Sequence, residues 1–205
     1  MNQRLSKIIE FAGLPAAGKT TTIHLLKVYL EDKDIKCKFL ETASKTSPIR
    51  NYKTDWIFDV WSVCRTIMQL IEASKNEDND WIIIERGLLD SIVWLNLFKD
   101  SGQITHAEFE IIKEFTLLSE WFNKIDLAIV LQIRFNTALT RGRTSGRIVN
   151  PIMYENLKYA YDTTIKELQS SKQIQNIVMY ETDDISPSDV INLLIEQQNI
   201  LNIVD

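Results

Sequence analysis

The sequence predicts an α/β protein in which helices flank a central parallel β-sheet, giving three layers. Short segments rich in β-branched residues alternate with longer segments of helical periodicity, which is the pattern of βαβ units. The segment 81–84 (Trp-Ile-Ile-Ile) is apolar at every position, as expected for a central strand covered on both faces. We therefore expect a five-stranded parallel sheet with strands at residues 7–12, 37–40, 81–84, 127–133 and 177–180.

The helices are predicted from apolar periodicity and from the polar residues that precede them. A long helix is expected from about Thr54 to Ser74, where apolar side chains recur at helical spacing. A second apolar helix, from Phe109 to Phe122, is expected to contribute either to the core or to an interface. Three helix starts carry capping residues, namely Thr105 with Glu108, Asn136, and Ser186 with Asp189.

Composition limits the class of protein. The chain has 205 residues, 45% of them hydrophobic, which is enough for one full core, so we expect a single domain over residues 1–205. A net charge of −5 argues against a nucleic-acid polymer as partner. Cys37 and Cys64 lie far apart and suggest neither a disulfide framework nor a zinc site. No apolar segment is long enough for a membrane span and no secretory signal is present, so a cytoplasmic location is expected.

The sharpest motif lies between the first predicted strand and the first predicted helix. Residues 13–20 read Gly-Leu-Pro-Ala-Ala-Gly-Lys-Thr, which fits the Walker A pattern at every position. In this context the backbone N–H groups of the loop and of the helix start converge on phosphate oxygens. The motif predicts the P-loop NTPase variant of the α/β fold, although a chance match in an ordinary strand–turn–helix is the alternative.

The motif assigns roles to individual side chains. Lys19 is expected to reach the β and γ phosphates of ATP, the phosphoryl donor, and the Thr20 hydroxyl is expected to join the ligands of Mg²⁺. The residues expected to bind the nucleotide are Gly13, Ala16, Ala17, Gly18, Lys19, Thr20, Thr21 and Arg141.

Charged residues follow two of the predicted strands, at the edge of the sheet where ligands bind in parallel α/β folds. Glu41 ends the second strand and is a candidate general base for an acceptor hydroxyl. Glu85 ends the third strand and is a candidate for the metal site, and Arg86 is a candidate for holding the transferring or acceptor phosphate. Each of them is alternatively a solvated residue at a strand end.

Residues 141–150 begin with Arg-Gly-Arg-Thr-Ser-Gly-Arg, which combines three arginines with two glycines. Arginine forks bind phosphate charge and glycines permit closure, so this segment is expected to form a lid. Arg143 and Arg147 are expected to act in phosphoryl transfer. A solvated basic loop has the same composition and is the alternative.

One face of the long predicted helix combines aromatic and hydrogen-bonding side chains. Phe58, Trp61, Arg65 and Gln69 follow one another at offsets of three, seven and eleven residues. Such a face is able to stack against a nucleobase and read it. Alternatively, the aromatic residues belong to the core while Arg65 and Gln69 are solvated.

A second nucleotide motif is excluded by its position. Residues 123–126 read Asn-Lys-Ile-Asp, which is the base-reading motif of GTPases, but that motif follows a strand and here the strand comes after it. We interpret these residues as the end of a helix.

Taken together, the ordered motifs resemble those of the thymidylate kinase and deoxynucleoside kinase families. The likeness spans most of the chain, and its segments are GLPAAGKTT, FLET, FDVWSVCR, WIIIERGLLDS, TRGRTSGR and YENLKYAYDTTI. Glu41 and the Glu85-Arg86 pair resemble deoxynucleoside kinases, whereas Asp90-Ser91 and the short Arg-Gly lid resemble bacterial thymidylate kinases. Trp61 and Arg65 resemble the aromatic and arginine pair that contacts the base in thymidylate kinases.

The resemblance implies ATP- and Mg²⁺-dependent phosphoryl transfer to a small acceptor, a nucleoside or a nucleoside monophosphate. The acceptor wall is expected to contain Glu41, Phe58, Trp61, Arg65, Gln69 and Arg86. A homodimer is a further expectation. Two alternatives remain open at this point, a P-loop kinase for another small hydroxyl compound and a nucleotide-binding regulatory module with little turnover.

Overall fold

The computed structural model describes residues 6–75, 78–144, 146, 150–171 and 176–198. Its five strands are β1 (Lys7–Gly13), β2 (Cys37–Leu40), β3 (Trp81–Glu85), β4 (Leu127–Gln132) and β5 (Ile177–Glu181). They form one sheet in the order β2-β3-β1-β4-β5, and every neighbouring pair is parallel. The predicted five-stranded parallel sheet is therefore confirmed.

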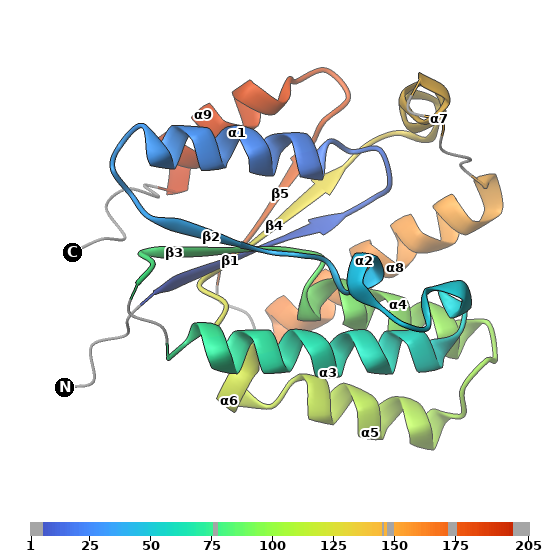
Figure 1. Cartoon of the computed structure of the whole chain (residues 1–205). Coiled ribbons are helices and arrows are strands. Elements are labelled where there is room, and N and C mark those ends of the chain that lie inside the picture. The colour runs from blue at the N-terminus through green and yellow to red at the C-terminus, as the bar shows by residue number, and fades with distance from the viewer. Residues whose placement is uncertain (1–5, 76–77, 145, 147–149, 172–175, 199–205) are drawn as a thin grey trace.

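Helices cover both faces of this sheet (Figure 1). On one face lie α1 (Lys19–Glu31) and α9 (Pro187–Gln198). The opposite face is covered by α3 (Trp56–Ala73), α4 (Leu88–Asp100) and α8 (Pro151–Ser170). The remaining helical elements are α2 (Ala43–Thr46), the 3₁₀ helix Arg50–Tyr52, α5 (His106–Thr116), α6 (Ser119–Phe122) and α7 (Phe135–Thr144).

The central strands are buried because both of their faces are covered. All residues of β3 and β4 are buried, and so are six of the seven residues of β1. Most side chains of these strands are apolar. One of the few polar exceptions is Glu10 in β1, which is fully buried. The register places Gly13 beside Leu131 and Phe11 beside Glu85, so the carboxyl ends of β1, β3 and β4 meet at one edge.

The helix predictions hold in part. The Thr105–Glu108 capping box is present, and Ser186 and Asp189 exchange the matching hydrogen bonds before α9. Asn136 is not a cap, because α7 begins one residue earlier and the Arg134 carbonyl accepts the first intrahelical bond. Residues 109–122 do not form one helix but the separate helices α5 and α6. Among the described residues, no helix combines the length and the apolar character that a membrane span requires.

Candidate functional site

The P-loop follows β1 and closes tightly against β4. Gly13 has φ of 123°, and a Cβ built on it would meet the Leu131 carbonyl oxygen at 2.0 Å, so no larger residue fits. Gly18 has φ of 94° and directly precedes α1. The chain thus turns within five residues and aims the amino end of α1 into the space that the loop surrounds.

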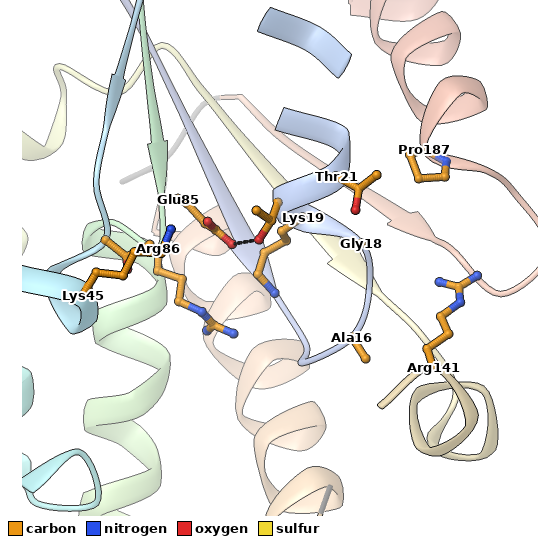
Figure 2. A pocket seen from close by; sticks show the side chains of 11 residues that line it. Ala16, Gly18, Lys19, Thr21, Lys45, Glu85, Arg86, Arg141 and Pro187 are labelled. Carbon is orange, nitrogen blue, oxygen red and sulfur yellow. Dashed lines mark hydrogen bonds between the residues drawn. The ribbon is translucent and has the colours of Figure 1, made fainter. Parts of the chain in front are cut away.

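Lys19 is buried inside the curve of this loop. Its Nζ donates to the carbonyl oxygens of Gly13 and Leu14, both at 2.8 Å. Figure 2 shows the side chain reaching from the start of α1 toward the loop. The ammonium group is therefore held at the place where a phosphate bound by the loop would lie.

Thr20 and Glu85 bring two oxygen groups together beside the loop. The Thr20 hydroxyl donates to Glu85 Oε1 at 2.6 Å, which links the start of α1 to the end of β3 (Figure 2). Within the described residues, no cluster of three or more His, Cys, Asp or Glu side chains forms a complete metal site. One hydroxyl and one carboxylate, however, match the few hard oxygen ligands that a protein offers to Mg²⁺ when phosphates supply others.

Arg86 begins the turn between β3 and α4, and its φ is 62°. Its N–H donates to the Phe11 carbonyl at 2.8 Å, and its guanidinium contacts both oxygens of Asp90, at 2.9 and 3.1 Å. Burial opposes the charge of Arg86, but the Asp90 carboxylate and other nearby groups raise the pKa of the guanidinium overall. Arg86 is thereby fixed in its charged form.

Tyr161, on α8, connects the Arg86–Asp90 pair to the P-loop. Its hydroxyl donates to Asp90 and accepts the Gly13 N–H at 2.9 Å. Burial raises the pKa of Tyr161 well above its usual range, so the hydroxyl keeps its proton for Asp90. A continuous set of hydrogen bonds therefore joins β1, α4 and α8 behind the site.

Glu10 supports the same turn from below. Its carboxylate accepts from the backbone N–H groups of Gly87, Leu89 and Asp90 at 2.9, 3.2 and 3.1 Å. A Cβ on Gly87 would lie 2.6 Å from Glu10 Oε2, so the close approach requires glycine. Burial raises the pKa of Glu10 to about 7, although these backbone N–H groups lower it.

The first cavity has a volume of about 500 Å³ and lies in front of the P-loop (Figure 2). Eight residues predicted from the sequence line it: Ala16, Gly18, Lys19, Thr20, Thr21, Glu85, Arg86 and Arg141. Three further lining residues, Thr42, Lys45 and Pro187, were not predicted. Gly13 and Ala17 are buried in the loop itself.

Arg141 forms part of the far wall of this cavity. Its guanidinium donates to the Thr182 carbonyl at 2.7 Å, which ties α7 to the segment after β5. Of the segment predicted to be a lid, residues 141–144 belong to α7 and Asn150 caps α8. Arg143 is exposed, and Arg147 lies outside the described residues.

A second cavity of about 310 Å³ lies between α3 and α4. Its lining residues are Thr42, Lys53, Thr54, Phe58, Asp59, Ser62, Arg86, Asp90, Ser91, Trp94, Phe98 and Met153. Thr42 and Arg86 line both cavities, so the two spaces adjoin at these side chains. Phe58 and Arg86 were predicted for an acceptor wall, whereas Asp59, Trp94 and Phe98 were not.

The structure does not bring the other predicted acceptor residues into this second cavity. Trp61 and Arg65 line a separate hollow with Thr46, Cys64 and Met68. Successive helix residues turn by about 100°, so Trp61 points nearly opposite to Asp59 on α3, and Arg65 points between Trp61 and Phe58. Gln69 lies further along α3 and lines none of these three cavities. Glu41 is exposed directly after β2, next to Thr42, and its side chain lines neither of the two adjoining cavities.

Residues 123–126, which carry the excluded GTPase motif, lie between the end of α6 and the start of β4. The Asp126 carboxylate accepts the Ile8 N–H at 2.7 Å immediately before β4, in agreement with the prediction that these residues do not read a base.

Asp59 could have been noticed in the sequence as the acidic residue within an apolar helix segment. Its direction toward a cavity depends on the packing of α3 against α4, which the sequence does not specify.

Similar structures are nucleoside and nucleotide kinases. Deoxyadenosine kinase from M. mycoides with bound dATP has a TM-score of 0.72 and 18% identity, covering 94% of this chain and 99% of that chain. Thymidylate kinase from Candida albicans has a TM-score of 0.67 and 12% identity, covering 100% of this chain and 96% of that chain. No family model and no curated protein matches the sequence. At these identities the likeness shows the fold, which is that of P-loop nucleoside and nucleotide kinases.

Proposed function

We propose that this protein transfers the γ-phosphoryl group of ATP, with Mg²⁺, to a nucleoside or a nucleoside monophosphate. The observation that carries the proposal is the pair of adjoining cavities with Arg86 at their junction. One cavity has the chemistry of a triphosphate site and the other has aromatic walls. The similar structures support this choice, since they are named deoxyadenosine kinase and thymidylate kinase and one of them contains dCMP with dCDP as products.

On the donor side, backbone N–H groups of residues 13–21 bind the phosphates and Lys19 neutralises their charge. Phosphoryl transfer passes through a loose transition state in which positioning and electrostatic stabilisation supply most of the catalysis. Arg141 borders the nucleotide, and Arg143 and Arg147 remain proposed as further arginines that act on the transferring group. Mg²⁺ bound to ATP would neutralise phosphate charge, with Thr20 and Glu85 as the residues that hold it.

On the acceptor side, Arg86 holds the reacting end of the acceptor at the junction of the cavities. Lys45, which also lines the donor cavity, adds a cation that suits either the transferring phosphate or a monophosphate acceptor. Phe58 offers an aromatic face to the acceptor. Trp61, Arg65 and Gln69 stay predictions from the sequence, and their positions outside the second cavity give them no added support.

Glu41 is proposed as the general base when the acceptor is a hydroxyl. Thr42, the next residue, lines both cavities, which supports the assignment. The Glu41 side chain is exposed, so it has to turn toward the cavities in order to act as the base. A phosphate acceptor needs no strong base. If a Glu41→Gln variant phosphorylated a nucleoside at the wild-type rate, the base assignment would be wrong.

A coupled assay of ADP release tests the proposed function. The purified protein, MgATP and a panel of nucleosides, nucleoside monophosphates and unrelated hydroxyl compounds should give ADP release that depends on one acceptor class. The Lys19→Ala variant should lose about 100-fold or more of this rate, since Lys19 contacts charge that develops in the transition state. Release that depends on an unrelated hydroxyl compound, or no release with ATP bound, would contradict the proposal.

We also propose that the protein is cytoplasmic and that it forms a homodimer. The homodimer is supported by an exposed apolar stripe along α3. This stripe is formed by Ile57, Met68 and Ile71 at 45% to 54% exposure, with Trp61 and Cys64 between them. These residues alternate at spacings of four and three, which is the pattern of a helix that pairs with another helix. Light scattering after gel filtration should give twice the mass of the 23.8 kDa chain, and a monomer at micromolar concentration would contradict this.

A further inference from the structure

Asp59 places a carboxyl group in the second cavity without a complete set of hydrogen-bond partners. The residue lies in the first turn of α3, is 6% exposed and lines the cavity. Ser91 donates a hydrogen bond to the carboxyl, but Oδ2 has no hydrogen-bond partner among the described residues. A buried carboxyl oxygen without a donor is costly, so the group that completes it is expected to come from a ligand.

The hydroxyl groups beside Asp59 have already used their hydrogens. The Ser91 hydroxyl donates to Asp59, and the Ser62 hydroxyl donates to the Phe58 carbonyl at 2.9 Å. Each hydroxyl has a single hydrogen, so both serine oxygens face the cavity only as acceptors. With Asp59 Oδ2, they make this part of the wall rich in acceptors and suited to a ligand edge that donates.

The charged side chains of the cavity do not complete Asp59. Arg86 is engaged with both oxygens of Asp90, and Lys53 is exposed at the cavity rim. Asp90 itself lines the cavity and adds negative charge. Burial first, and then Asp90, raises the pKa of Asp59 well above its usual range, while the Ser91 bond lowers it.

A nucleobase edge with an exocyclic amino group beside an unprotonated ring nitrogen, as in adenine and cytosine, fits this wall. If Asp59 is ionised, the amino group supplies the N–H that Oδ2 lacks, and its second N–H suits a serine oxygen. A protonated Asp59 would carry both a donor and an acceptor and would fit either edge, so the selection belongs to the ionised form, which the amino group stabilises. Uracil and hypoxanthine present a carbonyl oxygen in place of the amino group. This oxygen is itself an acceptor and would face the acceptor atoms of the wall without a hydrogen between them.

We propose that Asp59 is a specificity-determining residue that selects acceptors with an adenine-type or cytosine-type amino edge over their carbonyl counterparts. This inference rests on the proposed function and narrows its acceptor class. Trp94 and Phe98 from α4, together with Phe58, supply apolar walls for the flat faces of such a base.

Two matched pairs of acceptors test the inference directly. Deoxycytidine and deoxyuridine differ at the amino edge, and so do deoxyadenosine and deoxyinosine. Each pair should be assayed as nucleosides and as 5′-monophosphates, with kcat/KM measured for every compound. The wild-type protein should favour the amino member by about tenfold or more, since a site built for one hydrogen-bonding pattern rejects an analogue that lacks it.

The Asp59→Asn variant keeps the size of the side chain but carries both an acceptor and a donor, so it also accepts a carbonyl edge. The preference for the amino member should fall by about tenfold, mostly by a gain for the carbonyl member and a rise in KM for the amino member. Asp55→Asn is the matched control, because it makes the same change one turn earlier. Asp55 caps α3 by accepting the Ile57 N–H, asparagine caps equally well, and Asp55 does not line the cavity.

The outcomes separate this inference from the proposed function. Phosphorylation of nucleosides with no preference for the amino members, or an unchanged preference in a folded Asp59→Asn protein, would overturn the inference and leave the proposed function standing. If no compound were phosphorylated, the proposed function would fail, and calorimetric binding of deoxycytidine and deoxyuridine would decide about Asp59. Equal binding, or no binding of either, would then overturn the inference. If Asp59→Asn did not fold, the wild-type preference alone would decide.

Discussion

At the residue scale, Glu10 is the buried charge that supports the turn carrying Arg86. Its carboxylate accepts three backbone N–H groups from the start of α4, an arrangement that favours the ionised form. Burial acts more strongly in the opposite direction, and the pKa of Glu10 is raised to about 7. The carboxyl group therefore titrates in the folded protein near neutral pH.

This pKa predicts a pH dependence of stability. Since the folded pKa lies above the usual value of 4.5, the folded state binds the Glu10 proton more tightly than the unfolded state. The contribution of Glu10 to the free energy of unfolding is full below about pH 4.5 and is lost as the pH rises to about 7. At about 1.4 kcal/mol for each pH unit, the loss amounts to about 3 kcal/mol.

Glu10→Gln removes this titration and keeps the shape of the side chain. Urea denaturation at several pH values should show that the wild-type protein loses stability relative to the variant between about pH 4.5 and 7. Asp59, whose pKa is also raised, affects both proteins alike and cancels in the comparison. If the difference in the free energy of unfolding between the wild type and Glu10→Gln stayed constant with pH, the raised pKa of Glu10 would be contradicted.

Individual residues could be predicted from the sequence where a motif specifies both type and spacing. The Walker A pattern identified Lys19 and Thr20, and both line the first cavity. Glu10, Asp59 and Tyr161 could not be found in this way, because their partners lie 77, 32 and 148 residues away in the sequence. Whether two such residues meet depends on which side each helix turns toward its neighbour.

At the element scale, α8 is joined to the site through Tyr161. The Tyr161 hydroxyl contacts Gly13 at the start of the P-loop and Asp90 in α4, and Asp90 in turn holds Arg86. One side chain thus fixes three elements relative to one another. The fold offers a control on the same helix, since buried Tyr154 donates its hydroxyl to the Ile133 carbonyl and lines neither adjoining cavity.

Tyr161→Phe should therefore affect both stability and activity, whereas Tyr154→Phe should affect stability alone. Each change leaves a buried polar partner unpaired and should lower the free energy of unfolding by about 1–3 kcal/mol. Only Tyr161→Phe should lower kcat, by about tenfold, because it loosens the geometry of Arg86. Thermal melts and steady-state kinetics measure the two effects. Equal kcat values for both variants would show that Tyr161 is a structural residue without influence on the site.

Elements were predicted well where apolar pattern alone determines them, as in all five strands. The break between α5 and α6 was missed because no glycine or proline marks it. Trp121 explains the break, since its Nε1 donates to the carbonyls of Phe115 and Thr116 at 3.1 Å and so satisfies the end of α5. The start of α7 was misplaced for a similar reason. Its first turn is bound by Asp183, which lies 49 residues away from Arg134 in the sequence.

At the scale of the whole molecule, the site forms where the carboxyl ends of β1, β2 and β3 meet. The sequence predicted this edge, since ligands in parallel α/β sheets bind beyond the strand ends. It did not predict that the second cavity lies between α3 and α4, because that depends on how both helices pack. Arg86, supported by Glu10 and Asp90, lies where the first and the second cavity adjoin.

The proposed kinase activity requires phosphoryl transfer between these two cavities, and γ-³²P-labelled ATP allows this transfer to be followed. The protein is incubated with labelled MgATP and a mixture of nucleosides and nucleoside monophosphates, and the labelled products are separated and identified. We expect label on a nucleoside monophosphate or diphosphate, reduced about 100-fold or more in Lys19→Ala. Label that appears only as inorganic phosphate, or remains on ATP at the level of the variant, would contradict the proposed kinase.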